Sequence, residues 1–486
     1  MRVMAVHAVE CPVHASWGTA RFAGPPCRSK ALIRLPMACR RLHRCGFLVP
    51  QGKGFMPSGM KGLLRLLAAL SVLMQATWAC GAAAVGARVE TGAANDTVAQ
   101  TRPFMVGVGS AIRWGASTVA LAGELGVNSI RTDAPWKLIE VQRGQFAIPD
   151  WLEQWVVRSL AAGLSPVLIL DYGNVLYSKD KPRTPEEVEA FRRYAVFVVT
   201  HFKGRVRTYE LWNEWNNKTG DTTPGDPESY IRFARQVLPA LRQADPSAVI
   251  VAQGVSPGGL RGGWLDKFLA LGGAQGFDGV ALHPYSWSWK KDRSPEAAMR
   301  LVDGYQRTAA RHNGGKAVDF YITEMGWPSF DEPLGENRNA VGAFLARFLL
   351  MARCRPYIKG VWWHTLIDDG TDPANSEHHY GLFDADRKAK PAASALRETA
   401  SLIADASLVC SQSEQGDQMT LRLKGRQNFQ ITWQGGEIAP GGAKFQTRSR
   451  EGAADNSAVF HSNDMPLFHP SVGDLSGVPR VRKLQP

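Results

Sequence analysis

The sequence predicts a (β/α)8 barrel, an α/β fold, on two observations. Between residues 103 and 404, short apolar segments alternate with amphipathic ones eight times, the pattern of repeated β-α units around a parallel sheet. Successive apolar segments begin about 37 residues apart and the block takes about 300 residues, both within the range of such a barrel. The expected strands cover residues 104–108, 129–133, 166–171, 208–212, 249–252, 279–283, 318–323 and 360–363.

Amphipathic helices are expected between these strands. The segment 227–244 has proline near its start, as helices prefer, and carries Tyr230, Phe233, Val237 and Leu241 at helical spacing. The other expected helices cover residues 116–125, 151–162, 186–201, 339–351 and 391–403.

A doubly wound open sheet is the alternative fold. Such a sheet normally has fewer strands and a glycine-rich phosphate loop after the first one. The segment Gly107-Val108-Gly109 lacks the third glycine of that loop. The barrel is therefore the better interpretation.

A small β appendage is expected after the barrel, over residues 405–440. Residues 419–423 and 428–433 alternate apolar and polar side chains, as half-buried strands do. Glycine, serine, proline and charged residues dominate from Gly435 onward. We therefore expect the tail, residues 441–486, to be disordered.

The segment before the barrel, residues 1–102, predicts export. Residues 1–59 lack periodicity and are expected to be disordered, or an extension upstream of a true start at Met56 or Met60. Residues 60–84 have the basic start, apolar core and small residues of a secretory signal peptide, and residues 85–102 form a linker. The apolar core is shorter than the roughly 20 residues of a membrane span. We expect a periplasmic or extracellular protein with no stable membrane span, unless an uncleaved signal keeps it at the membrane.

Charge and motifs exclude several partners. The formal charge of +13 lies mostly in the first 60 residues, and no basic stripe with interleaved aromatic residues follows, so no nucleic acid is expected. No phosphate loop, flavin or nicotinamide fingerprint is present, so no cofactor is expected. Export permits a disulfide between Cys354 and Cys410, but the sequence does not show that they pair. The oligomeric state is left open.

Two carboxylates, Glu214 and Glu324, are the candidate catalytic residues. Each ends an otherwise apolar strand, where an ionised group is costly without partners. They lie three repeats apart, on the fourth and seventh strands, and so face each other across the barrel mouth, where barrel enzymes carry their chemistry. A facing pair of carboxyl groups is what glycoside hydrolysis with retention requires.

Polar and aromatic residues at the other strand ends fit a sugar-binding site. Asn213 offers an amide suited to a sugar 2-hydroxyl, and Tyr285 could hydrogen-bond a carboxylate. Tryptophans could stack on sugar rings, although alternation turns one of each adjacent pair into packing, and Trp362 is the one we expect in the core. The candidate substrate-binding residues are Asn213, Arg131, Asp133, Asp171, Tyr172, His283, Tyr285, Trp327 and Trp363.

At these residues the chain resembles the retaining glycosidases of clan GH-A, in which an Asn-Glu pair ends strand four and a second Glu ends strand seven. The resemblance covers about residues 103–404 and is nearest to glycoside hydrolase family 39. It also rests on the segments 126–133, 283–285, 324–328, 381–383 and 390–391.

The resemblance implies that Glu214 is the acid/base and Glu324 the nucleophile. It also implies that Asn213, His283 and Tyr285 line the cleavage subsite, with Arg131 beside the nucleophile. Known activities of the family include β-xylosidase, α-L-iduronidase and endoglycosidases of bacterial biofilm exopolysaccharide. The small C-terminal appendage favours the biofilm-associated relatives, in which a polysaccharide is the substrate.

Other functions remain open at this point. An exo-acting β-xylosidase-like glycosidase or a transglycosylase would use the same two carboxylates, and a non-catalytic sugar-binding barrel would keep the aromatic residues. A metal-dependent hydrolase is suggested by His283, His364, His378 and His379 near strand ends. These histidines lack the close spacing common in metal sites, so no metal is expected.

Overall fold

The computed structural model describes residues 104–218, 223–289, 291–329, 338–404, 409–415, 418–425, 428–435, 465–466 and 478–484. The expected extension, signal peptide and linker, residues 1–102, lie outside the described residues. Among the described residues, no helix has both the length and the apolar character needed to cross a bilayer.

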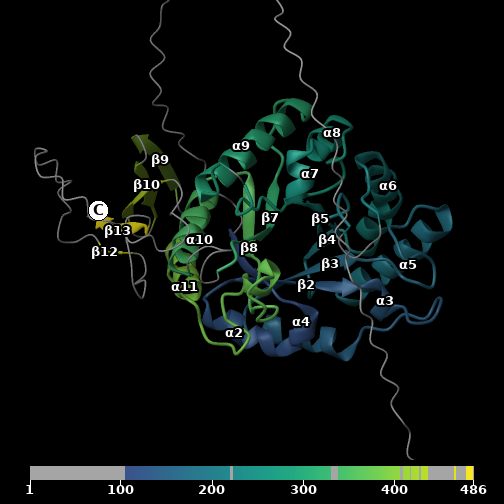
Figure 1. Ribbon diagram of the computed structural model, residues 1–486. Helices are drawn as coiled ribbons and strands as arrows, with labels where there is room; N and C mark the ends of the chain where they lie inside the picture. Colours follow the sequence, from purple (N-terminus) through teal and green to yellow (C-terminus); the bar gives the residue numbers. More distant parts are fainter. Residues whose placement is uncertain are drawn as a thin grey trace, which may run out of the picture. The chain divides into compact units, whose positions relative to one another are not determined.

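The predicted barrel is confirmed: eight parallel strands close in the order β1 to β8, with β8 pairing back onto β1. Figure 1 shows the strands at the centre of a ring of helices. Strand bounds differ from the expected ones by a few residues. The strands are β1 (Met105–Gly109), β2 (Ser129–Pro135), β3 (Ser165–Asp171), β4 (Thr208–Asn213), β5 (Val249–Val255), β6 (Gly279–Leu282), β7 (Phe320–Met325) and β8 (Ile358–Trp363).

Helices cover the outside of the barrel, and those expected from the sequence are present with small shifts. They are α2 (Thr118–Glu124), α4 (Asp150–Ala161), α5 (Pro185–His201), α6 (Pro227–Ala244), α10 (Arg338–Arg353) and α11 (Pro391–Ile403). Shorter helical segments not expected from the sequence are η1 (Ile112–Ser117), α3 (Trp136–Ile139), α7 (Pro257–Arg261), α8 (Trp264–Ala270) and η2 (Ser376–His379).

The sequence analysis missed one long helix, α9 (Pro295–His312). Its start is well specified, because the Ser294 side chain accepts a hydrogen bond from the Ala297 amide and Pro295 stands at the first turn. Arg311 and His312 in its last turn complement the helix dipole. The helix lies between β6 and β7 and completes the alternation of strands and helices.

The inside of the barrel is filled by alternate residues of five strands: Val167, Val251, Ala281, Tyr321 and Trp362. Because side chains alternate along a strand, the neighbours of these residues face outward and pack against the helices. The residues two positions further on face inward again, nearer the mouth of the barrel. The strand phase therefore selects which side chains reach the site.

Trp362 lies in the core, where the sequence analysis expected it. Its ring is fully buried and its Nε1 donates to Ser129 Oγ at 2.9 Å. Gly107 on β1 makes room for it, because a Cβ there would lie 2.1 Å from Trp362 Cδ1. This close approach explains the glycine in an otherwise apolar strand.

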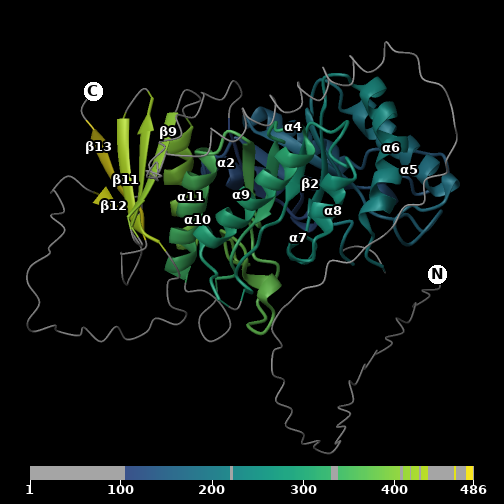
Figure 2. The same cartoon turned by 90° about the horizontal axis from the view of Figure 1, so that it is seen from above.

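The C-terminal region forms an antiparallel sheet in the order β12-β13-β11-β10-β9, whose main strands lie side by side in Figure 2. The strands are β9 (Val409–Gln415), β10 (Gln418–Lys424), β11 (Asn428–Gln434), β12 (Met465–Pro466) and β13 (Arg480–Leu484). The prediction of a disordered tail over residues 441–486 is wrong for β12 and β13, because β13 pairs with β11 and provides its missing backbone partners.

A disulfide and a side-chain hydrogen bond are among the contacts that join this sheet to the barrel domain. Cys354, next to α10, forms a disulfide with Cys410 of β9. Trp433 of β11 donates from Nε1 to Glu296 Oε1 of α9 at 2.9 Å. The pairing of the two cysteines, which the sequence left open, is thus settled by the fold.

Candidate active site

The carboxyl ends of the barrel strands surround a pocket of about 480 Å³. Most of the predicted site residues line it, at the strand ends where barrel enzymes carry their sites. Its lining includes Arg131, Asp133, Tyr172, Asn213, Glu214, Tyr285 and Glu324. The structure therefore brings together residues that come from five different strand ends.

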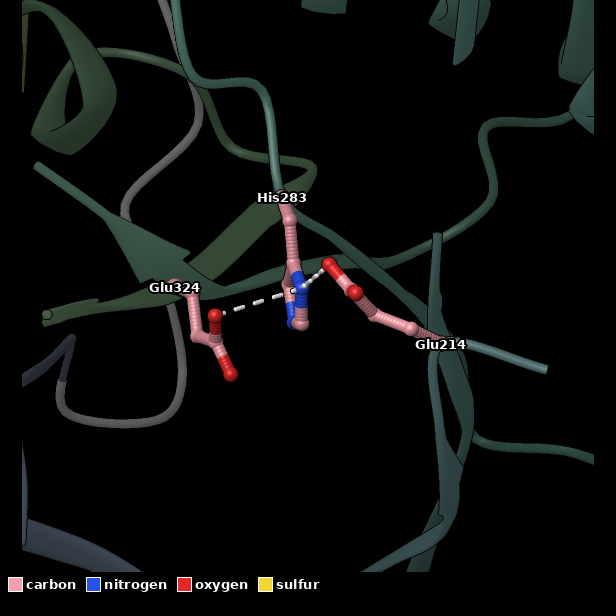
Figure 3. Close-up of side chains that lie close together, drawn as sticks. All are labelled: Glu214, His283 and Glu324. Carbon is pink, nitrogen blue, oxygen red and sulfur yellow. Dashed lines mark hydrogen bonds and ion pairs between the residues drawn. The ribbon is translucent and has the colours of Figure 1, made fainter. Parts of the chain in front are cut away.

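The two predicted catalytic carboxylates meet in this pocket. Glu214 follows β4, Glu324 lies near the end of β7, and an oxygen of one lies within 4.8 Å of an oxygen of the other. Figure 3 shows both side chains converging on His283. The side chain of Glu324 is only 14% exposed, so its surroundings determine its charge state.

Glu324 is held as a carboxylate by donors and positive charge. Arg131 Nη1 lies 2.8 Å from one of its oxygens, and Tyr285 Oη donates to the other at 2.9 Å. Burial raises the pKa of Glu324, but His283, Arg131 and His364 more than offset this and hold the pKa well below its usual range. Glu324 is therefore ionised over the whole physiological pH range.

Arg131 connects the nucleophile candidate to the rest of the site. Its Nε lies 2.8 Å from Glu210 Oε2, and its Nη2 donates to Asn213 Oδ1 at 3.0 Å. Burial lowers the pKa of Arg131, but Glu210 and Glu324 outweigh it and raise the pKa above its usual value. Asn213 in turn donates from Nδ2 to Tyr172 Oη at 2.8 Å, so the orientation of its amide is fixed.

Glu214 has a different set of partners. One carboxylate oxygen lies 3.0 Å from His283 Nδ1, and the other accepts from Asn217 Nδ2 at 3.1 Å. Its oxygens thus contact an imidazole, which can share a proton, and a carboxamide, which donates a hydrogen bond.

The backbone around Glu214 adopts an unusual conformation. Trp212 has φ 77° and Glu214 has φ 48°, left-handed values that cost roughly 1–3 kcal/mol for such residues. The conformation is held by the Glu214 amide, which donates to Gly254 O at 3.1 Å, and by the Trp215 amide, which donates to Gln253 Oε1 at 2.7 Å. Strain of this kind is typical of functional sites.

Four predicted substrate-binding residues do not line the pocket: Trp363, Trp327, Asp171 and His283. Trp363 follows the inward-facing Trp362 and therefore faces outward, where it packs on Trp327 at 5.9 Å between ring centroids. Trp327 is fully buried and donates from Nε1 to Arg293 O at 3.0 Å. Asp171 is also fully buried. The prediction that these side chains reach the sugar-binding surface is wrong for this structure.

His283 lies beneath the pocket rather than on its wall. It is fully buried and reaches both carboxylates, with Nδ1 3.0 Å from Glu214 and 3.5 Å from Glu324. Burial lowers the pKa of His283, but Glu324 and Glu214 outweigh it and raise the pKa. Trp212 and Trp215, which could have stacked on sugars, are also fully buried and pack around Phe233.

Asp133 and Asp171 form a second pair of acids at this end of the barrel. Asp133 lines the pocket, whereas Asp171 lies behind it. Burial raises the pKa of both carboxyls, and the charge of Asp133 raises the pKa of Asp171 further. Asp133 is thus a polar group at the pocket surface, suited to hydrogen bonding.

Several site residues were missed by the sequence analysis. Glu210 on β4 points into the barrel, where it pairs with Arg131 on β2. An acidic residue within an apolar strand is a sequence signal that could have identified it. Asn217, Trp287 and Tyr380 line the pocket from loops. Loop conformation could not be derived from the sequence, so no signal identified these three.

Glu214, His283 and Glu324 could together offer three ligand atoms to a metal ion. Within the described residues, this is the group of histidine, cysteine and acidic side chains close enough to do so. Arg131 lies 2.8 Å from Glu324, however, and a permanent positive charge at that distance opposes a bound cation. The donor set therefore fits a metal poorly.

Comparison with known proteins finds structures of similar fold. No family model matches the sequence, and no curated protein matches it. A family 39 glycoside hydrolase from the gut symbiont Bacteroides cellulosilyticus WH2 matches with a TM-score of 0.57 and 24% identity, over 68% of this chain and 71% of that one.

A second solved structure, a GH5_18 protein from Bifidobacterium longum subsp. infantis, has a TM-score of 0.50 and 16% identity, over 62% of this chain and 79% of that one. At these identities the likeness shows the fold, a (β/α)8 barrel shared with glycoside hydrolases. The structural neighbours thus agree with the clan GH-A resemblance on which the sequence analysis relied.

Proposed function

We propose that the protein is a retaining O-glycosyl hydrolase that cleaves a polysaccharide or oligosaccharide. The observation that carries this proposal is the pair Glu214 and Glu324, whose oxygens approach within 4.8 Å inside a polar pocket. Retaining glycosidases place their carboxyl groups about 5–5.5 Å apart, whereas inverting ones need roughly 6.5–9.5 Å to admit a water. The spacing therefore favours double displacement.

The different surroundings of the two carboxylates assign their roles. Glu324, ionised and held by Arg131 and Tyr285, attacks the anomeric carbon. Glu214 gives a proton to the glycosidic oxygen as that bond breaks, so the leaving sugar departs as an alcohol. Glu214 then takes a proton from a water molecule, whose oxygen displaces Glu324 and releases the sugar with its original anomeric configuration.

The pocket supplies the contacts that a sugar ring needs. Asn213 is placed beside both carboxylates with its amide fixed by Arg131 and Tyr172, where it can meet a 2-hydroxyl. Asp133 offers hydrogen bonds to other hydroxyls. Trp287 and Tyr380 present aromatic surface at the pocket wall, on which sugar rings can stack.

We further propose that the substrate is a bacterial exopolysaccharide attacked within the chain, and that the protein is exported. The resemblance to family 39, together with a small C-terminal sheet, supports this substrate class. The disulfide between Cys354 and Cys410 supports an oxidising compartment, because such bonds persist outside the cytoplasm. Export agrees with the signal-peptide pattern of residues 60–84.

The test is to incubate the full chain with a panel of plant and bacterial polysaccharides and to identify released oligosaccharides by mass. Glu324→Gln should release none, while Glu398→Gln, an exposed acid on α11, should match the parent. Proton NMR of the first-formed product should show the anomeric configuration of the substrate. Product of inverted configuration, or equal activity of Glu324→Gln, would overturn the proposal.

Transglycosylation would use the same glycosyl-enzyme, intercepted by a sugar hydroxyl in place of water. Repeating the incubation with an excess of a short oligosaccharide acceptor separates the two outcomes. Products longer than the substrate would assign the enzyme to transfer, and their absence would assign it to hydrolysis.

A further inference from the structure

A chain of buried hydrogen bonds runs from Arg131 to Glu214 behind the pocket. Arg131 Nε lies 2.8 Å from Glu210 Oε2, and the other oxygen of Glu210 lies 3.2 Å from Thr323 Oγ1. Thr323 Oγ1 lies 3.0 Å from His283 Nε2, and His283 Nδ1 lies 3.0 Å from Glu214 Oε1. These contacts join β2, β4, β6 and β7 across the inside of the barrel.

Hydrogen-bond chemistry fixes the direction of this chain. Glu210 is paired with Arg131 and fully buried, and a carboxylate in such a pair can only accept. The single hydroxyl proton of Thr323 therefore goes to Glu210. The oxygen of Thr323 is left as an acceptor for His283, so the proton on that side of the ring must sit on Nε2.

The consequence appears on the other side of the imidazole. A neutral His283 that carries its proton on Nε2 presents a bare lone pair from Nδ1 to Glu214. A bare nitrogen and a bare carboxylate oxygen 3.0 Å apart repel each other. One proton between them turns the repulsion into a hydrogen bond, whichever of the two atoms formally holds it.

We propose that Glu210 and Thr323 lock the tautomer of His283, so that His283 and Glu214 share one proton that serves as the catalytic acid. This inference rests on the proposed role of Glu214. Thr323 and Glu210 are positioning residues here, because they act on Glu214 only through His283.

The charges around His283 support this arrangement. Glu214, Glu324 and Glu210 face the ring, with Glu210 at 4.0 Å from Nε2, whereas Arg131 is the nearby cation and Tyr285 lies edge-on at 6.4 Å between centroids. Burial lowers the pKa of His283, but the carboxylates outweigh burial and raise it. The net field of these groups therefore favours the protonated ring of His283.

The balance of charge changes during the reaction. When Glu324 forms its bond to the anomeric carbon it loses its negative charge, and at the same step the shared proton passes to the leaving oxygen. The pair is then left with a carboxylate facing a bare Nδ1, which drives it to take a proton from the incoming water. Water oxygen bonds to the anomeric carbon, the bond to Glu324 breaks, and the starting charges are restored.

The kinetic test is Thr323→Val, which removes the hydroxyl and keeps the shape. A neutral His283 could then carry its proton on Nδ1 and donate it to the Glu214 carboxylate, so the deprotonated pair would no longer be disfavoured. We expect the alkaline limb of the pH profile of kcat/KM to move to lower pH by about one unit, for substrates with poor leaving groups.

The controls separate this effect from a loss of packing. Thr323→Ser restores the hydroxyl and should restore the parent profile. Thr399→Val removes a buried hydroxyl on α11 that donates to Ala395 O, and should leave the profile unchanged. An unshifted alkaline limb in folded Thr323→Val would overturn the proposal.

A second measurement does not depend on activity. Nitrogen-15 NMR of the histidine-labelled full chain reports which ring nitrogens carry protons. We expect the signals of one histidine to show a protonated Nε2 and an Nδ1 that is bare or shares a proton. These signals should change in Thr323→Val and stay the same in Thr399→Val. A neutral ring with its proton on Nδ1 in the parent would refute the lock, even in an active enzyme. The expected tautomer in an enzyme that cleaves no glycoside would support the lock and count against the proposed function instead.

Discussion

Glu214 and Glu324 stand in one pocket, yet the structure surrounds them with different partners. Glu324 contacts a permanent cation, Arg131, and a hydroxyl donor, Tyr285. Glu214 contacts an imidazole and an amide, of which the imidazole can gain or lose a proton in the physiological range. Two carboxylates of the same chemistry can thus take two roles, because their surroundings differ.

The contrast also has a structural origin. Glu324 lies within β7, where the pairing with β8 shifts register between Ile322 and Met325, and its side chain reaches Arg131. Glu214 lies just after β4, in a left-handed backbone segment. Local departures from regular strand geometry thus place both carboxylates, within the strand for Glu324 and just after the strand for Glu214.

The largest expected effect comes from exchanging each carboxylate for an amide. Glu324→Gln removes the nucleophile and should abolish turnover of every substrate. Glu214→Gln should lower kcat/KM by roughly 10²–10⁴-fold for poor leaving groups, the usual contribution of an acid, and far less for activated aryl glycosides that need no proton. Initial rates on the two substrate types measure both. Equal losses of Glu214→Gln on both types would contradict the assignment of the acid.

Arg131→Met should produce the next largest effect, because it leaves Glu324 and Glu210 buried without their cation. We expect a loss of about 3–5 kcal/mol in the free energy of unfolding, as for other broken buried ion pairs. Without the cation the pKa of Glu324 rises, so the acid limb of the kcat/KM profile should move to higher pH. Chemical denaturation and the pH profile measure the two effects.

Arg347→Met is the matched control for this variant. It breaks the buried ion pair with Glu296, away from the pocket, and should cost comparable stability. The acid limb of its kcat/KM profile should stay at the pH of the parent, because no side chain of the pocket loses a partner. An equal shift of the acid limb in both variants would mean that the shift reflects instability and not the charge beside Glu324.

Tyr285→Phe tests the hydroxyl side of the same carboxylate. Hydrogen bonds to a charged group contribute about 1.5–3 kcal/mol, so kcat/KM should fall roughly 10- to 100-fold. The pKa of Glu324 is depressed in the folded protein, so its ionised form persists below the usual pKa of a glutamate. Loss of one donor raises that pKa, and activity should fail at a higher pH on the acid side.

Tyr305→Phe serves as the comparison, since its hydroxyl donates to Leu260 O outside the pocket. The acid limb of this variant should coincide with that of the parent. If Tyr285→Phe also kept the parent limb, Tyr285 would contribute to packing and not to the charge of Glu324.

The strand order and the two carboxylates could be predicted from the sequence, because both show as differences between neighbouring apolar and polar residues. An acid that ends an apolar strand stands out, and repeats of similar length place it on the barrel. The phase of each strand was harder to predict, and the assignment of Trp363 to the site failed there. Two adjacent tryptophans are equally apolar, and only the packing of Tyr321 and Val167 beside Trp362 decides which one faces inward.

Contacts between distant segments could not be predicted. Asn217 and Tyr380 reach the pocket through loops, whose conformations depend on tertiary contacts such as the ion pair of Lys390 with Asp368 at 2.6 Å. The strand β13 pairs with β11 about fifty residues earlier, and no periodic pattern announces a strand of five residues. In these cases the structure of a segment is specified by the residues that it packs against or pairs with, rather than by its own sequence.

Asn217→Ala should give the smallest effect and the finest test of the comparison. Asn217 is exposed, so water screens its hydrogen bond to Glu214; we expect that bond to contribute about 0.5–1.5 kcal/mol and its loss to lower kcat/KM roughly 2- to 10-fold. The loss should appear with poor leaving groups and not with activated ones, because the Asn217 amide nitrogen donates to Glu214. Asn313→Ala, which removes an exposed amide after α9, should match the parent on both. An effect of Asn217→Ala that is equal on both substrate types would place Asn217 in substrate binding and remove it from the proton-handling half of the site.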